Sequence, residues 1–399
     1  MARNALSYDA VKLLPSSPMR LGVAAFGTDG AKSGIGSYLR QWLEAFDGSD
    51  PAIDMDFMAP RSEMSELVPP TLLAKLSPTS DTLRSPMRSV VWHQGGLPLA
   101  ARRGSWDVAF LPAANRRLAA WMPCPTVGTV HDMSMARVKG KYDRFHSAYV
   151  HTVLPALIRR LTRVVTVSEC SKRDIVELAH VDPARIDVIP HGVNRERFHP
   201  REDAADQATR SAMGLAAPYL LYVARLEHPG KNHVALIRAF DRMKTRLGAP
   251  HQLVLAGSPW NGAEDVYAAA RAARHSADIV FTGFTSEASL PALYRGAFAY
   301  VFPSLYEGFG MPLLEAMASG TPVACSNTSS LPEVAGDAAL YFDPADQDAM
   351  EAGLEALISD PARRRELIER GLRRAATFSW RASVDRTLAV FRQAVKEAA

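Results

Sequence analysis

The sequence predicts an α/β protein made of two similar halves, each built around a parallel β-sheet. Short apolar runs of strand length alternate with longer amphipathic runs of helix length along the 399 residues. The alternation begins near residue 20, breaks over 190–200 and starts again at 219. Because strands that alternate with helices pair in parallel, we expect one Rossmann-like sheet in each half. We expect a leader over residues 1–18, domains over 19–196 and 197–378, and a C-terminal helix over 379–399.

The first half opens with an apolar strand over Arg20–Phe26, a glycine-rich loop, and a helix from Gly34 to Phe46. A strand, a glycine loop and a helix in this order are typical of the start of a βαβ unit. Ser168 is expected to cap a helix over Ser171–Ala179. The further strands expected in this half are residues 106–111, 126–130, 164–167 and 186–189.

The second half repeats the pattern after the segment Pro190–Pro200, which combines prolines with charged residues and marks the expected domain boundary. The helices expected here are residues 232–247 and 290–295, and Phe378–Trp380 leads into a last amphipathic helix. The expected strands are residues 219–223, 252–256, 279–282, 299–302, 322–324 and 339–342.

The composition is that of a globular protein, with 47% hydrophobic and 22% charged residues. No apolar run approaches the length of a membrane span, and Met1–Leu21 lacks the apolar centre of a signal peptide. Cys124, Cys170 and Cys325 are far apart and odd in number, which argues against a disulfide framework and a clustered metal site. We therefore expect a cytoplasmic protein.

Basic residues are concentrated in one part of the chain. Between Arg84 and Arg163 there are thirteen Lys and Arg residues against three Asp and Glu, whereas the whole chain carries a net charge of only +4. Such a block suggests an anionic partner. The arginines are not interleaved with aromatic residues, so we do not expect nucleic acid. An anionic membrane surface or a phosphorylated lipid fits, and a solvated face with scattered arginines is the alternative.

The most informative segment is Ser304–Gly320, in which Glu307 and Glu315 flank the run Gly-Phe-Gly-Met-Pro. Gly308 and Gly310 allow the backbone to approach a ligand closely. The N-terminus of the following helix favours phosphate, and a carboxylate one turn inside it can reach hydroxyl groups. The segment predicts a site for a ligand with a polyhydroxyl end and an anionic middle. The alternative is a buried, capped helix with two structural carboxylates.

The glycine loop Gly34-Ile35-Gly36 is a second candidate. Leu39 stands where the dinucleotide fingerprint has its third glycine, and the Gly-Lys-Ser/Thr of a P-loop is missing. Binding of NAD or of ATP by a P-loop is therefore not supported. The loop suits a phosphate or a sugar at a helix N-terminus, or it is a tight turn.

Charged residues also follow two expected strands, at the carboxyl ends where open α/β sheets bind ligands. Arg225 and Lys231 follow the first strand of the second half, and two cations there suit a diphosphate; surface charge is the alternative. His131 and Asp132 follow strand 126–130. His131 could donate to a sugar hydroxyl or a leaving group, and Asp132 could orient it or accept a proton. A structural hydrogen bond between them is the alternative.

Taken together and in order, these motifs resemble those of retaining glycosyltransferases of the GT-B fold, glycosyltransferase family 4. The resemblance covers about residues 20–395. It rests on Gly34–Gly36, Thr129–Asp132, Val165–Glu169, Val188–Val193, Arg225 with Lys231 and Asn232, Thr282–Phe284, and the run from Pro303–Gly310 to Leu331–Gly336. The resemblance implies two domains that face a central cleft, with the C-terminal helix packed back on the N-terminal domain.

The resemblance also implies a role for each matching residue. The expected catalytic residues are Arg225 and Lys231, which would neutralise the departing diphosphate, Glu307, which would contact the transferred sugar, and His131, which would bind the donor sugar. The expected donor-binding residues are Gly34, Ile35, Gly36, Gly283, Phe284, Phe309, Gly310, Met311, Leu314 and Glu315, with Glu315 on the ribose hydroxyls. The expected acceptor-binding residues are Asp132, Arg137, Lys139 and Lys141. No metal and no other cofactor is implied.

The activity implied by the resemblance is transfer of a hexose, with retention, from a nucleoside diphosphate sugar to a saccharide hydroxyl. Our guess for the donor is GDP-mannose. The expected acceptor is a saccharide, linked to polyprenyl diphosphate, of bacterial surface polysaccharide such as O-antigen, reached by peripheral contact with the inner face of the plasma membrane. Ala224 and His191 stand where glycine and asparagine are common, and both could alter donor choice.

Several alternatives stay open. The donor could be a UDP-sugar or dTDP-rhamnose, and the chain could be a nucleotide-sugar binding protein without turnover. A glycoside hydrolase would also use two carboxylates, but it would not need the cation pair. A phosphorylase would need a lysine-bound pyridoxal phosphate site, for which the sequence offers no support.

Overall fold

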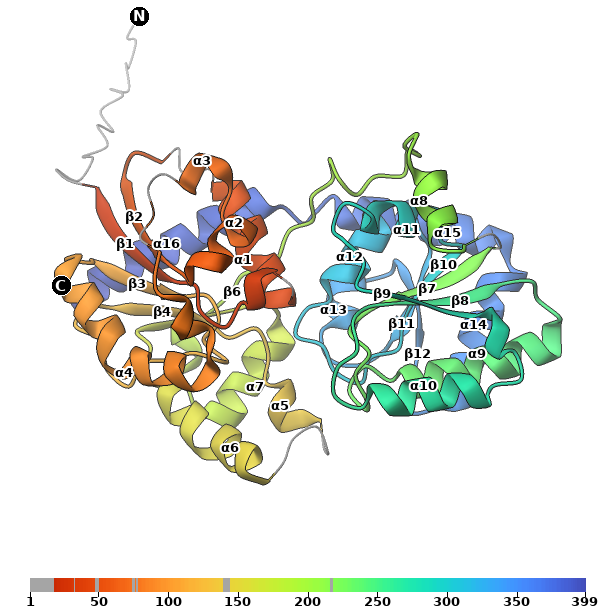
Figure 1. Ribbon diagram of the computed structural model, residues 1–399, viewed down its shortest axis with the longest axis horizontal. Coiled ribbons are helices and arrows are strands. Elements are labelled where there is room, and N and C mark those ends of the chain that lie inside the picture. Colours follow the sequence, from red (N-terminus) through yellow and green to blue (C-terminus); the bar gives the residue numbers. More distant parts are fainter. Residues whose placement is uncertain are drawn as a thin grey trace, which may run out of the picture.

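The computed structural model describes residues 18–31, 33–46, 50–73, 76, 78–138, 144–215 and 218–399. It contains two six-stranded sheets, each flanked by helices, which lie side by side (Figure 1). We call the part around the first sheet the N-terminal domain and the part around the second the C-terminal domain. Every strand pair within the two sheets is parallel, so the predicted α/β architecture is confirmed.

The N-terminal sheet has the strand order β2-β1-β3-β4-β5-β6. Because the chain starts inside the sheet and winds outward in both directions, loops diverge at the carboxyl ends of β1 and its neighbours and leave room for a ligand. The strands are β1 (Met19–Ala24), β2 (Ile53–Met58), β3 (Val108–Leu111), β4 (Thr126–Thr129), β5 (Arg163–Thr166) and β6 (Ile186–Val188).

Helices cover both faces of this sheet. One buried cluster lies under α1, and a second lies under α4, α6 and α7. Ser168 caps α7 by accepting a hydrogen bond from the backbone N of Ser171 at 3.0 Å, although the helix begins two residues before the predicted start. The helices are α1 (Gly34–Phe46), α2 (Met64–Leu67), α3 (Pro70–Leu73), α4 (Pro86–Arg103), α5 (Ser134–Arg137), α6 (Arg144–Ile158) and α7 (Glu169–Ala179).

The C-terminal sheet has the order β12-β11-β10-β7-β8-β9 and encloses one continuous core. Its strands are β7 (Tyr219–Val223), β8 (Gln252–Ala256), β9 (Ile279–Gly283), β10 (Ala299–Phe302), β11 (Val323–Ser326) and β12 (Ala339–Phe342). Its helices are α8 (Asp206–Ala212), α9 (His233–Leu247), α10 (Ala263–Ala272), α11 (Leu290–Gly296), α12 (Met311–Ala318), α13 (Leu331–Ala335), α14 (Gln347–Ser359) and α15 (Pro361–Ala375).

The last helix, α16 (Trp380–Ala398), returns to the N-terminal domain, as predicted (Figure 1). Its buried side chains, which include Trp380 and Phe391, belong to the same core cluster as Trp42 of α1. Trp380 Nε1 donates a hydrogen bond to Gln41 Oε1 at 3.0 Å. The chain therefore passes between the domains twice, once after β6 and once before α16.

The predicted domain limits at 196/197 and 378/379 stay predictions, and residues 1–17 of the predicted leader lie outside the described residues. Among the helices that the structure describes, none combines the length and the apolar character needed to cross a membrane.

Candidate active site

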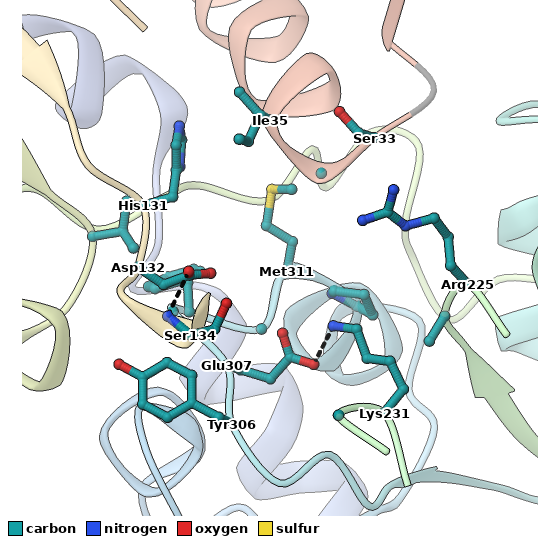
Figure 2. Close-up of a pocket in the computed structure, with 18 of the residues that line it drawn as sticks. Ser33, Ile35, His131, Asp132, Ser134, Arg225, Lys231, Tyr306, Glu307 and Met311 are labelled. Atoms are coloured by element: carbon teal, nitrogen blue, oxygen red, sulfur yellow. Dashed lines mark hydrogen bonds and ion pairs between the residues drawn. The ribbon is translucent and has the colours of Figure 1, made fainter. Parts of the chain in front are cut away.

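A cavity of about 300 Å³ lies between the two domains. Its N-terminal wall comes from the loops that follow β1, β3 and β4, and its C-terminal wall from the loops that follow β7 and β10. Figure 2 shows Ser33 and Ile35 on one side, His131 and Asp132 on another, and Arg225, Lys231 and Glu307 opposite them. The site is thus built at the carboxyl ends of both sheets, where the sequence placed it.

Lys231 and Glu307 form an ion pair inside the cavity. Lys231 Nζ lies 2.6 Å from Glu307 Oε1, and the two side chains are 23% and 13% exposed (Figure 2). Arg225 lines the same cavity, and its guanidinium stacks on Trp260 with Cζ 4.5 Å from the ring centroid. Within the described part of the chain, Arg225 has no acidic partner. The charge of Lys231 is therefore offset by a carboxylate, whereas that of Arg225 is available to a ligand.

The segment that carries Arg225 is fastened to the segment that carries Trp260. Leu226 donates its backbone N–H to Ser258 O at 2.9 Å, and Trp260 donates to Leu226 O at 3.1 Å. A Cβ atom at Gly257 would lie 1.9 Å from the carbonyl oxygen of Ala224, so the two segments can approach this closely only because residue 257 is glycine. The indole ring is consequently fixed beneath the guanidinium.

The Glu307 loop leads into α12, whose N-terminus borders the cavity. Gly310, with φ 102°, precedes the helix, and Pro312 occupies its second position. Gly34 faces this helix start, because a Cβ atom at Gly34 would lie 3.9 Å from Met311 Cε. The glycine loop of one domain and the helix N-terminus of the other thus lie on two sides of one space, and a helix N-terminus generally favours an anion.

The same loop is held by α7 of the opposite domain. Ser168 Oγ and Ser171 Oγ donate to Gly308 O at 2.7 and 3.3 Å. The carboxylate of Glu333, in α13, accepts hydrogen bonds from the backbone N–H groups of Glu169 and Cys170 at 2.9 and 3.2 Å. The structure therefore shows the cleft closed, with the Glu307 loop anchored across it.

His131 is neutral in this structure. Burial lowers its pKa to about 4, and its Nε2 lies 2.9 Å from Pro112 O. Because a carbonyl can only accept, Nε2 carries the proton and Nδ1 is left as an acceptor. In this tautomer Nδ1 of His131 can accept a hydrogen bond from a sugar hydroxyl, and the predicted role of His131 at the donor sugar stays a prediction. Asp132 lines the cavity and accepts from Ser134 N at 2.9 Å.

Arg137, one of the predicted acceptor contacts, is bonded to acidic residues outside the cavity. The guanidinium of Arg137 is bonded to Asp174, with Nη2 2.6 Å from Oδ1, and to Glu177, and Arg137 does not line the cavity. The structure therefore favours a structural role for Arg137 over the predicted acceptor contact. Lys139 and Lys141 lie outside the described residues.

The predicted donor contacts divide into two groups. Gly34, Ile35, Phe309, Gly310 and Met311 line the cavity, whereas Gly36, Gly283, Phe284, Leu314 and Glu315 do not. The side chain of Leu314 is fully buried in the core, and its predicted donor contact stays a prediction. The ring of Phe284 is 60% exposed beyond β9 and can still stack on a base.

Glu315 is half-buried in α12 and does not line the cavity. Its Oε2 accepts a hydrogen bond from Tyr294 OH at 2.9 Å. Burial raises the pKa of Glu315, while the hydroxyl of Tyr294 and the charge of Arg197 act in the opposite direction. Its predicted contact with a ribose stays a prediction.

Several cavity residues were missed from the sequence. Asn115 and Arg116 follow β3, and the Oδ1 atom of Asn115 is buried without a hydrogen-bond partner in the described structure. His191, which the sequence singled out as a position that could alter donor choice, also lines the cavity and packs between Trp380 and Phe309, with ring centroids 5.4 and 4.8 Å away. The rule that ligands bind at carboxyl ends of strands could have singled out Asn115 and Arg116, since they follow a predicted strand.

Tyr306 was also missed, although it precedes Glu307 directly. It lines the cavity, and its hydroxyl donates across the cleft to Asp174 Oδ2. As for metals, the described residues contain no group of three or more His, Cys, Asp or Glu side chains that could hold an ion. The two Asp-x-Asp triplets of the chain lie outside the cavity, where Asp56 accepts from Trp106 and Asp346 caps α14.

Comparison with known proteins agrees with this geometry. Residues 34–197 match the family described as Glycosyltransferase Family 4, and residues 207–374 match Glycosyl transferases group 1. The O-antigen chain mannosyltransferase B of Escherichia coli is 33% identical over 271 residues, which cover 67% of this chain and 70% of that protein. The MMP alpha-(1->4)-mannosyltransferase of Mycolicibacterium hassiacum is 32% identical over 320 residues, covering 75% and 74%.

The fold has solved counterparts. The sucrose-phosphate synthase of Thermosynechococcus elongatus superposes with a TM-score of 0.74 at 19% identity, over 96% of this chain and all of that one. At this identity the likeness concerns the fold alone, and it confirms the predicted GT-B arrangement. With a cation-lined cavity between two parallel-sheet domains and relatives matched over two thirds of its length, the chain belongs to glycosyltransferase family 4.

Proposed function

We propose that this glycosyltransferase moves mannose from a nucleoside diphosphate sugar, with GDP-mannose as our choice, to a hydroxyl of a saccharide acceptor, with retention of configuration. The observation that carries the proposal is the pair Arg225 and Lys231, which faces the Gly34 loop and the start of α12 in a cavity between the domains. The choice of mannose rests on the two relatives named as mannosyltransferases.

The chemistry requires the anomeric C–O bond to break while negative charge builds on the diphosphate. Arg225, Lys231 and the N–H groups at the start of α12 are fixed donors aimed at that charge, and such preorganised donors stabilise the transition state. His131 Nδ1 would accept from a hydroxyl of the sugar. We propose that the acceptor oxygen attacks from the side that the diphosphate leaves. The proton of the attacking hydroxyl then passes to a phosphate oxygen.

Glu307 is the carboxylate that pairs with Lys231, and this ion pair supports a role in holding the donor sugar. A double displacement would need a carboxylate free to attack the anomeric carbon. The assay described below distinguishes this function from two alternatives, a glycoside hydrolase and a nucleotide-sugar binding protein without turnover.

The acceptor that we propose is a saccharide linked to polyprenyl diphosphate, used in bacterial surface polysaccharide synthesis. One relative is named for the O-antigen chain, which supports this choice. A cytoplasmic protein with peripheral contact to the inner face of the membrane would meet such a lipid, and the basic residues between Arg84 and Arg163 suit that contact.

The decisive assay measures nucleoside diphosphate release from GDP-mannose, UDP-glucose, UDP-galactose and dTDP-rhamnose, each with and without a mannosylated acceptor. We expect acceptor-dependent release from GDP-mannose and an α-linkage in the product by NMR. Release from another donor would replace the donor assignment. Binding without release from any donor would support the non-catalytic reading, and cleavage of glycosides without any nucleotide would support a hydrolase.

A further inference from the structure

The outward face of α4 is apolar, which is the reverse of what a surface helix of a globular protein shows. Met87, Val91, Gly95 and Leu99 follow one another at intervals of four residues, so they form one line along the helix. Met87 is 74% exposed, Val91 65% and Leu99 46%. A Cβ atom at Gly95 would meet nothing within 4 Å. This line therefore faces open solvent.

The opposite face of α4 accounts for the packing of the helix. His93 and Leu97 are fully buried, and Ala101 is 2% exposed. The exposed line is thus not needed to hold the helix on its domain. In Figure 1, α4 lies on the side of the N-terminal domain that points away from the C-terminal domain, so no other part of the described chain covers it.

A tryptophan is mounted beside this line. The side chain of Gln94 accepts from Ala120 N at 2.9 Å and donates to Leu118 O at 3.0 Å, which fixes the loop that carries Trp121. The ring of Trp121 is 49% exposed, and the guanidinium of Arg102 stacks on it with Cζ 5.2 Å from the ring centroid. An aromatic ring held at the edge of an apolar surface is characteristic of side chains that sit at a membrane interface.

The charges that α4 itself carries have one sign. The 18 residues of α4 contain no Asp or Glu, and Arg88, Arg102 and Arg103 are all exposed. An apolar stripe with arginines at its margins inserts side chains at the boundary between headgroups and acyl chains, while the guanidinium groups meet lipid phosphates. The charge complementarity favours an anionic bilayer over a second copy of this chain, which would bring these arginines together.

We propose that Met87, Val90, Val91, Leu99 and Trp121, together with Arg88 and Arg102, form the surface by which this protein lies on an anionic membrane. This surface would make the membrane contact that is part of the proposed function, and its biological role rests on that function. The surface is on the N-terminal domain, so the C-terminal domain can open and close the cleft while α4 stays in the interface.

The test is flotation of the full chain with vesicles of phosphatidylethanolamine and phosphatidylglycerol, or of phosphatidylcholine alone. We expect binding to the anionic vesicles that weakens as salt rises. Met87→Ser with Val91→Ser should weaken it at least about tenfold, because two apolar side chains leave the interface. Arg88→Gln with Arg102→Gln should weaken it by a similar factor on anionic vesicles only.

Matched controls lie on the C-terminal domain. Leu247→Ser, at a side chain 37% exposed, and Arg373→Gln, at one 70% exposed, should leave vesicle binding unchanged. Every variant should keep the thermal unfolding midpoint and the rate of transfer to a water-soluble acceptor. The wild type could bind vesicles without transferring sugar, while the α4 variants bind vesicles more weakly. That result would refute the proposed function and still support the membrane surface.

Three results would overturn the inference. The wild type could fail to float with anionic vesicles at low salt, or the α4 variants could float as well as the wild type. Alternatively, the wild type could sediment as a dimer that Met87→Ser with Val91→Ser converts to a monomer, which would assign the face to self-association.

Discussion

The guanidinium of Arg225 stacks on the ring of Trp260, with Cζ 4.5 Å from the ring centroid. Cation–π stacking contributes about 0.5–2 kcal/mol, so we expect Trp260→Ala to lower kcat roughly twofold to thirtyfold by loosening Arg225. Trp260→Phe should keep most of the wild-type kcat, because a phenylalanine ring can also stack on the guanidinium. In an Arg225→Gln background Trp260→Ala should cost little more, and steady-state kinetics on the four proteins measures this coupling.

The chain offers a matched control for that cycle. Arg102 stacks on Trp121 in the same way but far from the cavity, so Trp121→Ala should leave kcat on a water-soluble acceptor unchanged. Additive losses in the Arg225 and Trp260 variants would show that the stacking does not position the arginine.

Lys231→Ala should lower turnover by at least about 10²-fold, as loss of a single electrostatic donor does in other enzymes. The ion pair adds a second expectation: Lys231→Ala leaves the carboxylate of Glu307 without its partner beside the proposed diphosphate site. Calorimetry should therefore find that GDP binds more weakly to Lys231→Ala than to Lys231→Ala with Glu307→Gln. Near-wild-type turnover of Lys231→Ala would remove the lysine from the catalytic set.

Gly308→Ala should prevent the cleft from closing. The added Cβ atom would lie 2.3 Å from the backbone oxygen of His131 in the opposite domain, and a backbone atom cannot move aside easily. We expect kcat/KM to fall at least about 10²-fold, with a larger radius of gyration by small-angle X-ray scattering. Gly95→Ala, where the new Cβ meets nothing, is the control. Unchanged scattering and activity in Gly308→Ala would contradict the closed contact.

The pH dependence of stability should include a term from His93. Burial lowers the pKa of His93 to about 4 in the folded chain, against about 6.5 when unfolded. Between these values the unfolded chain binds more protons, so this contribution is full above pH 6.5 and is lost as the pH falls towards 4. It amounts to about 3 kcal/mol. Urea unfolding at several pH values between 7 and 4.5 gives the free energy of unfolding as a function of pH. This free energy should fall less steeply with decreasing pH in His93→Gln than in the wild type, and an equal pH dependence would refute the assignment.

The sequence predicted most strands because strands buried on both faces are short apolar runs. It missed β2, an edge strand in which Asp54 and Asp56 interrupt the apolar pattern, because a strand with one neighbour tolerates polar side chains. The cations and carboxylates of the site were found because they stand at strand ends. The stacking of Arg225 on Trp260 could not be found, because it joins loops after different strands.

The direction of the His131 hydrogen bond was equally out of reach. It depends on a carbonyl at Pro112 in another loop and on burial produced by the packing of several elements. In the same way, the sequence shows that α4 carries arginines but not which of its faces the domain covers. The sequence pattern indicates which types of residue stand at the site, whereas contacts between residues of different loops and domains are visible only in the three-dimensional structure.

The return of α16 to the N-terminal domain has a consequence for biosynthesis. Trp380 and Phe391 are parts of the same core as Trp42, although more than three hundred residues of chain separate them. A ribosome that has finished the N-terminal sheet has therefore not yet made one wall of its core, whereas the C-terminal sheet and its helices emerge complete. The core of the domain that is synthesised first is therefore completed by the part of the chain that is synthesised last, and until then the apolar faces of α1 and the sheet lack the cover that α16 gives them.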